Sequence, residues 1–215
     1  MEITASLVKD LRERTGVGMM ECKKALVHTD GDIEKAIDYL RETGVAKAAK
    51  KAGRIASEGI VECYVHGGGR IGVMIEVNCE TDFAAQNPEF KEFAKDLAMQ
   101  IAANRPEYVK REDVPAAVVE HEKDIVRQQA INEGKNPNFL DKIIEGRLKK
   151  FYEDAVLMEQ SFIKDENLTV QDKLTQLIQK IGENISVRRF VRYERGEGLE
   201  KKVDNFVEEV MNQIK

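Results

Sequence analysis

The sequence reads Ile71-Gly72-Val73-Met74-Ile75-Glu76-Val77 and then Asn78-Cys79-Glu80-Thr81-Asp82-Phe83-Ala84-Ala85-Gln86-Asn87-Pro88 at the position that decides its fold. The first run alternates apolar and other residues, which predicts a strand, and residues 60–66 predict a second strand. Residues 67–70 join the two strands as a hairpin. Because Asn87 can cap a helix and Pro88 can begin one, an apolar helix follows and must lie on the hairpin. These elements predict a two-layer core of antiparallel sheet and helices.

The glycine run at 67–69 has a second interpretation, as a cradle for phosphate. A phosphate loop leads into a helix N-terminus, whereas a strand follows here. The hairpin interpretation is therefore favoured.

Residues 1–44 show three short segments with helical spacing, with Gly16 and Gly44 as stops. Helices this short must share a core, so we expect a three-helix module. Residues 45–57 are rich in Ala, Lys and Arg, which favours a solvated linker, either helical or irregular, over an RNA-binding patch. Inside the module, residues 15–20 read Thr-Gly-Val-Gly-Met-Met. They predict either a helix–helix turn with one Met as filler or an adaptable apolar contact loop.

The rest of the core, over 58–196, carries a predicted antiparallel helical hairpin at about 115–160, with helices over 115–134 and 138–160. Thr169 caps a further helix that ends at Gly182, and a strand follows over 185–193. On that strand Arg188 and Arg192 share a face with Phe190 while Arg189 lies opposite, which favours surface ion pairs over nucleic-acid binding. Residues 197–215 predict an amphipathic helix that docks on its own chain or on a partner.

Bulk composition excludes several classes of protein. The 215 residues are 42% hydrophobic and 34% charged, and the net charge of -5 argues against a dedicated nucleic-acid binder. No apolar run is long enough to span a membrane, and residues 1–4 lack a secretion signal, so we expect a cytoplasmic protein. Neither the three cysteines nor the three histidines have the spacing of a disulfide framework or a metal site, and we expect no cofactor. The cysteines are Cys22, Cys63 and Cys79, and the histidines are His28, His66 and His121.

Phe83 beside Asp82 is an unusual pair for a polar loop, and a rigid loop of this kind is suited to pressing into a partner. The run around it, Cys-Glu-Thr-Asp-Phe, resembles the signature of the elongation factor Ts family. Ala84 stands where that family usually has Val, and Gln86 where it usually has Arg. Residues 7–26, 145–152 and 180–190 resemble the same family, so the resemblance spans nearly the whole chain.

The resemblance implies an α+β fold whose N-terminal module is similar to ubiquitin-associated domains. It also implies a guanine-nucleotide exchange factor that binds elongation factor Tu, both GDP-bound and nucleotide-free, and displaces its magnesium and phosphate contacts. Residues 81–84 (Thr81, Asp82, Phe83 and Ala84) would intrude near the phosphates, and Val17, Met19 and Met20 would grip the nucleotide domain. By analogy with short forms, the chain would pair as a homodimer.

Two other classes of function stay open from the residues alone. The three-helix module and the basic segment also fit a ubiquitin-like-domain or RNA-binding adaptor. An enzyme is disfavoured because no nucleophile–base pair, carboxylate dyad or metal cluster can be argued from spacing. We therefore expect a protein that acts by binding, without a membrane or direct nucleic-acid partner.

Overall fold

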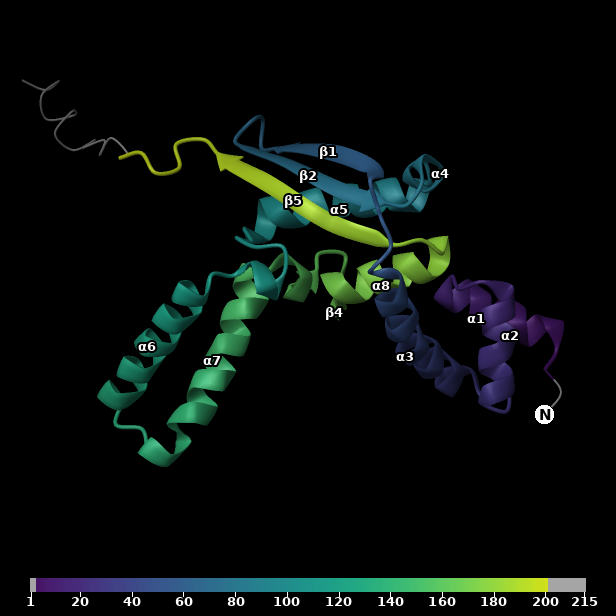
Figure 1. The fold of residues 1–215 in the computed structure, drawn as a ribbon, viewed down its shortest axis with the longest axis horizontal. Coiled ribbons are helices and arrows are strands. Elements are labelled where there is room, and N and C mark those ends of the chain that lie inside the picture. The colour runs from purple at the N-terminus through teal and green to yellow at the C-terminus, as the bar shows by residue number, and fades with distance from the viewer. Residues whose placement is uncertain (1–2, 201–215) are drawn as a thin grey trace, which may run out of the picture.

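The computed structural model describes residues 3–200, which form a helical module, a central sheet with covering helices, and a projecting helical hairpin (Figure 1). Mixed helix and antiparallel sheet confirm the α+β prediction. The helices are α1 Ala5–Thr15, α2 Met19–His28, α3 Ile33–Lys51, α4 Asp82–Ala85, α5 Pro88–Asn104, α6 Ala116–Asn132, α7 Leu140–Ala155 and α8 Val170–Ile181. The strands are β1 Glu58–His66, β2 Ile71–Cys79, β3 Ser161–Phe162, β4 Asp165–Thr169 and β5 Ile185–Glu194. Three-residue 3₁₀ turns lie at Arg111–Asp113, Pro137–Phe139 and Leu157–Glu159.

Helices α1, α2 and α3 enclose a small apolar core of their own, as the sequence predicted. Leu11, Cys22, Leu26 and Ala36 are fully buried in it. Gly16 ends α1 in the left-handed conformation, with φ 68°, which glycine adopts at little cost. The likeness of this module to ubiquitin-associated domains stays a prediction.

The expected stop at Gly44 is wrong, because α3 continues to Lys51. Gly44 is buried against the side chain of Gln179 on α8, so its missing side chain serves close packing instead of ending the helix. The Ala and Lys residues that follow are strong helix formers. Ala48, in the segment expected to be a solvated linker, packs on the central core.

The main sheet has the order β1-β2-β5, and all its pairs are antiparallel. The register between β2 and β5 shifts at one point. Glu76 of β2 lies opposite Arg189 and Val77 lies opposite Val187, so Arg188 is an extra residue in a bulge of β5. The predicted placement of Arg188 beside Phe190 is therefore wrong, since Arg188 joins Arg189 on the outer face, while Arg192 shares a face with Phe190 as predicted. Both pair with Glu76, at 2.8 and 2.7 Å, which confirms the expected ion pairs.

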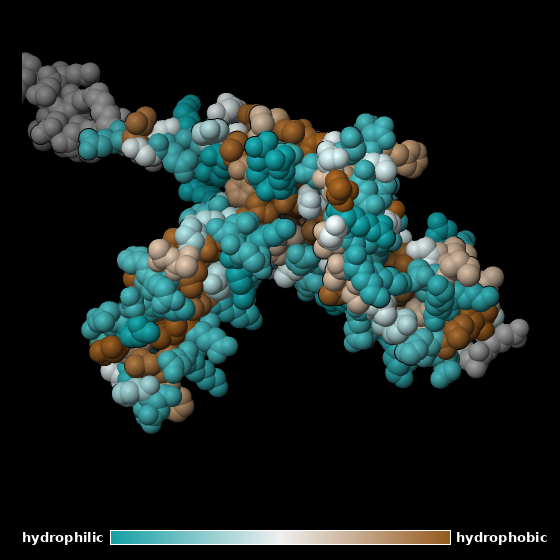
Figure 2. Space-filling model, viewed as in Figure 1, coloured by the Kyte–Doolittle hydropathy of each residue, from teal (hydrophilic) through white to brown (hydrophobic). Residues whose placement is uncertain are grey.

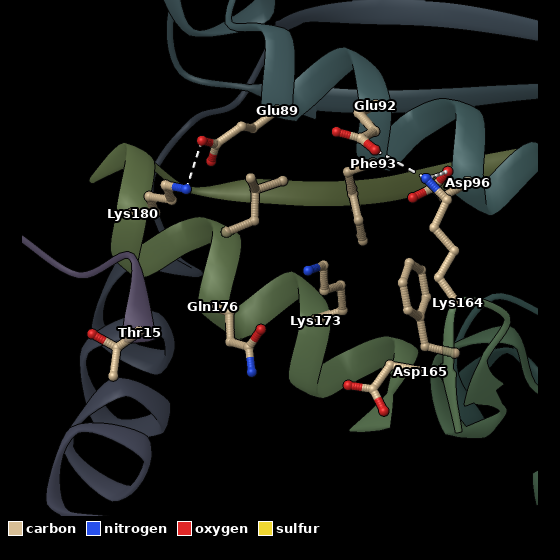
Figure 3. A pocket seen from close by; sticks show the side chains of 12 residues that line it. Thr15, Glu89, Glu92, Phe93, Asp96, Lys164, Asp165, Lys173, Gln176 and Lys180 are labelled. Atoms are coloured by element: carbon tan, nitrogen blue, oxygen red, sulfur yellow. Dashed lines mark hydrogen bonds and ion pairs between the residues drawn. The ribbon is translucent and has the colours of Figure 1, made fainter. Parts of the chain in front are cut away.

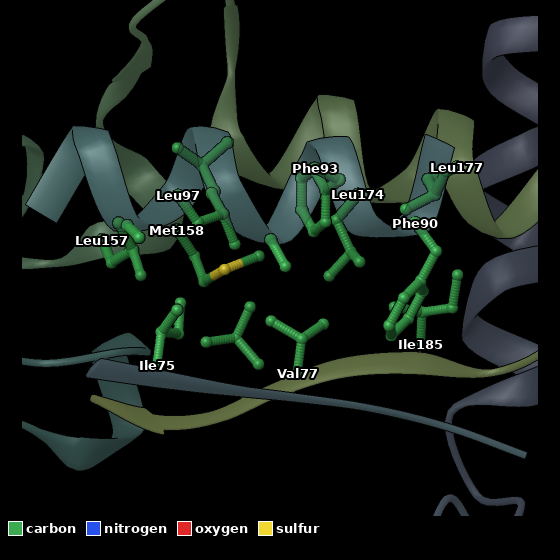
Figure 4. Close-up of a cluster of buried hydrophobic side chains, with 14 of the residues drawn as sticks. Ile75, Val77, Phe90, Phe93, Leu97, Leu157, Met158, Leu174, Leu177 and Ile185 are labelled. Carbon is green, nitrogen blue, oxygen red and sulfur yellow. The ribbon is translucent and has the colours of Figure 1, made fainter. Parts of the chain in front are cut away.

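Helices α5 and α8 cover one face of the sheet, and the main core lies between these two layers (Figures 1 and 4). Asn87 and Pro88 begin α5 as predicted, with Asn87 Oδ1 accepting from Glu89 N at 2.9 Å. The fully buried large side chains of this core come from both layers: Ile75, Val77, Phe90, Leu97, Ile101, Leu157, Val170 and Ile185.

Helices α6 and α7 form the expected hairpin, which projects away from the core (Figure 1). Apolar side chains gather between the two helices, with polar groups on the flanks (Figure 2). The second helix ends at Ala155, not near residue 160. Met158 belongs to the 3₁₀ turn that follows, and its side chain packs in the main core. The short β3–β4 hairpin after it has no apolar alternation and was not predicted.

The expected amphipathic helix over 197–215 lies mostly outside the described residues. Within the described part of the chain, no helix is long and apolar enough to cross a membrane. Over the same residues, no cluster of three or more His, Cys, Asp or Glu side chains could hold a metal ion.

Candidate functional site

The segment predicted to be a loop around Phe83 forms the single-turn helix α4, and its two sides differ sharply. Ala84 and Ala85 are buried in the main core. Asp82 and Phe83 point outward, and the Phe83 side chain is 85% exposed. A ring this exposed contributes almost nothing to the core, so the turn presents it to solvent or to a partner.

Thr81 caps this turn with its side chain. Its Oγ1 accepts from Ala84 N at 3.2 Å and donates to Glu183 Oε1 at 2.6 Å. The other oxygen of Glu183 accepts from the backbone amides of Glu80, at 3.1 Å, and Thr81, at 3.0 Å. The Glu183 carboxylate thus fixes the start of α4 from the turn between α8 and β5.

A second carboxylate, that of Glu80, bonds from the start of the α4 segment back to the turn between α8 and β5. Glu80 Oε1 accepts from Asn184 N at 2.6 Å, and this bond is the main reason that the pKa of Glu80 lies below its ordinary value. Arg54 donates to the same oxygen at 3.3 Å, and Asn184 Nδ2 donates to Arg54 O at 2.8 Å. The wedge turn, defined here as residues 80–85, is therefore anchored to the turn between α8 and β5 and to Arg54, which follows α3.

Cys79 and Gln86 lie at the two ends of the wedge turn and bond within the chain. Cys79 is buried, which raises the pKa of its thiol, and its Sγ donates to Thr81 O at 3.1 Å. Gln86 Oε1 accepts from Lys91 Nζ at 2.6 Å. Position 86, where the sequence departs from the family signature, therefore bonds with the following helix α5.

The methionines of the N-terminal module lie on the surface. Met19 and Met20, at the start of α2, are 42% and 66% exposed. Because neither fills the module core, the interpretation of one Met as filler is wrong. Val17 is buried and its carbonyl accepts from Cys22 Sγ at 3.4 Å, so Val17 supports this corner without offering contact surface. In Figure 1 the start of the chain and α4 lie toward the same end of the longest axis.

The predicted site residues therefore divide into two groups. Asp82, Phe83, Met19 and Met20 are exposed, while Ala84 and Val17 are buried and Thr81 is engaged within the chain. Sequence reasoning missed Glu183, although an acid directly after the helix stop at Gly182 is a signal for a capping or anchoring role.

A pocket of about 400 Å³ between α5, α8 and the β3–β4 hairpin is an alternative candidate site (Figure 3). Its charges are largely paired with one another. Lys164 Nζ lies 2.8 Å from Asp96 and 2.9 Å from Glu92, and Lys180 Nζ lies 2.6 Å from Glu89. These pairs tie the elements together, and the carboxylates hold the pKa of Lys164 above its ordinary value.

Basic side chains of the segment 45–57 also form ion pairs within the chain. Lys47 pairs with Glu21, and Arg54 pairs with Glu80. Burial lowers the pKa of Lys51. This segment therefore behaves as a structural connection between the module and the core, not as a free cationic patch.

Comparisons with known proteins agree over almost the whole chain. The family model described as Elongation factor TS matches residues 9–177. Proteins named elongation factor Ts from Heliobacterium modesticaldum and Desulforamulus reducens are each 62% identical to this chain, over 212 and 214 residues. The protein of that name from Acetivibrio thermocellus is also 62% identical, over 212 residues. These alignments cover 99–100% of this chain and 99% of each relative.

Proposed function

The chain belongs to the elongation factor Ts family of translation elongation factors, and on this premise we propose that it is a guanine-nucleotide exchange factor for elongation factor Tu. In this proposal it binds the GDP-bound GTPase, promotes release of GDP and holds the nucleotide-free state. It acts by binding, without covalent chemistry of its own. The observation that carries the proposal is the exposed Phe83 ring on an anchored turn.

The physical basis of exchange is linkage. A partner that binds the nucleotide-free GTPase better than the GDP-bound one weakens GDP binding by the same factor. Accelerating release about ten-thousandfold requires about 5.5 kcal/mol of differential stabilisation of the release transition state. One buried aromatic anchor supplies about 2–4 kcal/mol, so Phe83 needs help from further contacts.

The exposed residues of the wedge turn supply chemistry suited to this task. Phe83 would displace side chains that surround the nucleotide, and Asp82 would bring a negative charge toward the bound diphosphate and its magnesium ion. Like charges repel strongly where water is excluded, so Asp82 would weaken the phosphate contacts. Thr81 and Ala84 would act through the position of the turn, because one is hydrogen-bonded internally and the other is buried.

Met19 and Met20 form the second contact in this proposal. Methionine side chains adapt to irregular apolar surfaces, and both lie at the exposed corner of the module. Val17 would shape that corner from below. The module would then grip the nucleotide domain while the wedge turn reaches the phosphates.

We further propose that the chain forms a homodimer through the outer face of its sheet. Apolar side chains are exposed there on all three strands: Val61, Val65, Met74, Val191 and Tyr193. Met74 lies in register with Cys63 on one side and Val191 on the other, so the face is contiguous across the strands. A second copy would cover this surface from water.

Stopped-flow release of a fluorescent GDP analogue from elongation factor Tu tests the exchange proposal. Phe83→Ala removes a side chain that is 85% exposed, so the fold should persist. Loss of about 2–3 kcal/mol of transition-state stabilisation would slow release by about 30- to 150-fold. The matched control is Phe139→Ala, an exposed phenylalanine beside the tip of the α6–α7 hairpin. An unchanged rate with Phe83→Ala would sink the proposed role of the ring.

A further inference from the structure

The Glu183 carboxylate is unusual in where its hydrogen bonds go. Three donors converge on it, and all three belong to two successive residues, Glu80 and Thr81. Glu183 is half-buried and lies in the turn between α8 and β5, more than 100 positions further along the sequence. Charge-assisted bonds of this kind are shorter and stronger than neutral ones, so this is a firm tether on a short segment.

The tether acts directly on the orientation of α4. Thr81 Oγ1 donates a hydrogen bond to Glu183, which leaves the oxygen lone pairs free to accept from the Ala84 amide. That capping bond fixes the first turn of α4 and hence the direction in which Phe83 leaves the backbone. A helix of four residues has too few internal bonds to hold itself, so its geometry depends on this cap and on the buried Ala84 and Ala85.

From this geometry we propose that Glu183 is a positioning residue for nucleotide exchange. It touches neither nucleotide nor GTPase, and it holds Thr81, and through it Phe83, in the orientation that enters the partner. The inference rests on the proposed exchange function and deepens it. It also assigns Thr81 to orientation within the chain in place of direct contact.

The tether should act on rate more than on affinity. Without Glu183, the wedge turn samples several orientations and must be ordered during the exchange step, which reduces the fraction of productive encounters. Met19 and Met20 lie on the separate module and keep their exposure, so they should still hold the partner. A split between the maximal release rate and the dissociation constant is therefore the expected signature.

The experiment compares full-length Glu183→Ala, Glu183→Gln and Glu194→Ala in release of a fluorescent GDP analogue from elongation factor Tu. Glu183→Ala should lower the maximal release rate about tenfold or more and change the dissociation constant of the complex less than about threefold. Glu183→Gln keeps an oxygen that can accept from both backbone amides, and its rate should stay within about threefold of the wild type. Glu194 accepts from Arg70, Arg105 and Arg192 at the far end of β5. Glu194→Ala therefore removes as many hydrogen bonds as Glu183→Ala, but at a site away from the wedge turn.

Hydrogen exchange at the Glu80 and Thr81 amides gives a readout that does not depend on the GTPase. Both amides should exchange faster in Glu183→Ala and should keep their protection in Glu194→Ala. If Glu183→Ala leaves the maximal release rate unchanged while Phe83→Ala slows it, the positioning role is wrong and the exchange function stands. If the wild-type chain does not accelerate GDP release, the exchange proposal itself fails, whereas an unchanged rate with Phe83→Ala refutes only the role of the ring. If Glu183→Ala and Glu194→Ala lower the maximal release rate equally, general destabilisation explains the effect and the inference is overturned.

Discussion

Gly44 lies inside α3, where glycine ordinarily weakens a helix, and the space left by its missing side chain is filled by Gln179 of α8. A Cβ at position 44 would lie 0.9 Å from Gln179 Nε2. The same nitrogen donates to Leu40 O at 3.1 Å. We therefore predict that Gly44→Ala expels the Gln179 amide and loosens the contact between the N-terminal module and the core.

Two effects of similar size oppose each other in this variant. Alanine is favoured over glycine in a helix interior by about 1 kcal/mol. The lost hydrogen bond of Gln179 costs about 1 kcal/mol, and the displaced side chain also loses packing. The free energy of unfolding should therefore fall by about 0–1 kcal/mol in the wild-type background. With Gln179→Ala already present, Gly44→Ala should raise it by about 1 kcal/mol, because the helix gain is then unopposed.

Urea unfolding followed by circular dichroism on the four proteins of this cycle measures the coupling directly. The expected interaction energy between positions 44 and 179 is about 1–2 kcal/mol. Gly146→Ala is the matched control, because this glycine lies inside α7 with open space around its Cβ position. It should stabilise by up to about 1 kcal/mol in either background. If Gly44→Ala has the same effect with and without Gln179, within about 0.3 kcal/mol, the packing argument is refuted.

Two further predictions concern the sheet. Met74→Glu places a charge in the middle of the outer apolar face, so it should shift a homodimer to monomer in size-exclusion chromatography with light scattering; a dimer that persists would argue against this interface. Arg188 and Arg189 hold the pKa of Glu76 below its ordinary value of 4.5. A carboxyl whose pKa is lowered by folding stabilises the folded state fully at a pH above its ordinary pKa. This stability is lost as the pH falls through the lower pKa of the folded state. Urea midpoints should therefore fall more between about pH 5 and pH 3 in the wild type than in Glu76→Gln, and parallel profiles would contradict the assignment.

The sequence predicted those parts of the fold that local patterns determine. Alternating residues placed β1 and β2, and the Asn87–Pro88 pair placed the start of α5. It failed where a distant contact overrides the local signal. Gly44 has the character of a helix stop, but it lies inside a helix because the Gln179 side chain fills the space beside it, and no local pattern indicates that contact. Likewise the alternation over 185–193 carries no sign that Arg188 is an extra residue, because the bulge is defined by the partner strand.

The candidate site shows the same division. Phe83 was identified from the sequence because an exposed aromatic beside an acid is unusual in a polar segment. The roles of Thr81 and Ala84 depend on what packs beneath them, and periodicity over a four-residue helix cannot reveal it. Glu183 is separated from Thr81 by 102 positions, so only the folded chain brings the two together.

One side of the short helix in the wedge turn packs in the folded chain, and the other side is exposed for binding. Ala84, Ala85 and the bonds of Glu183 order the turn while the chain folds, so little conformational freedom remains to be lost when a partner arrives. Phe83 adds almost nothing to folding because it stays 85% exposed, and burying its ring is worth about 1.5–3 kcal/mol. Nearly all of that free energy is therefore available for binding. It follows that exchange activity can be weakened from either side: by removing the ring, or by loosening an anchor that the partner never touches.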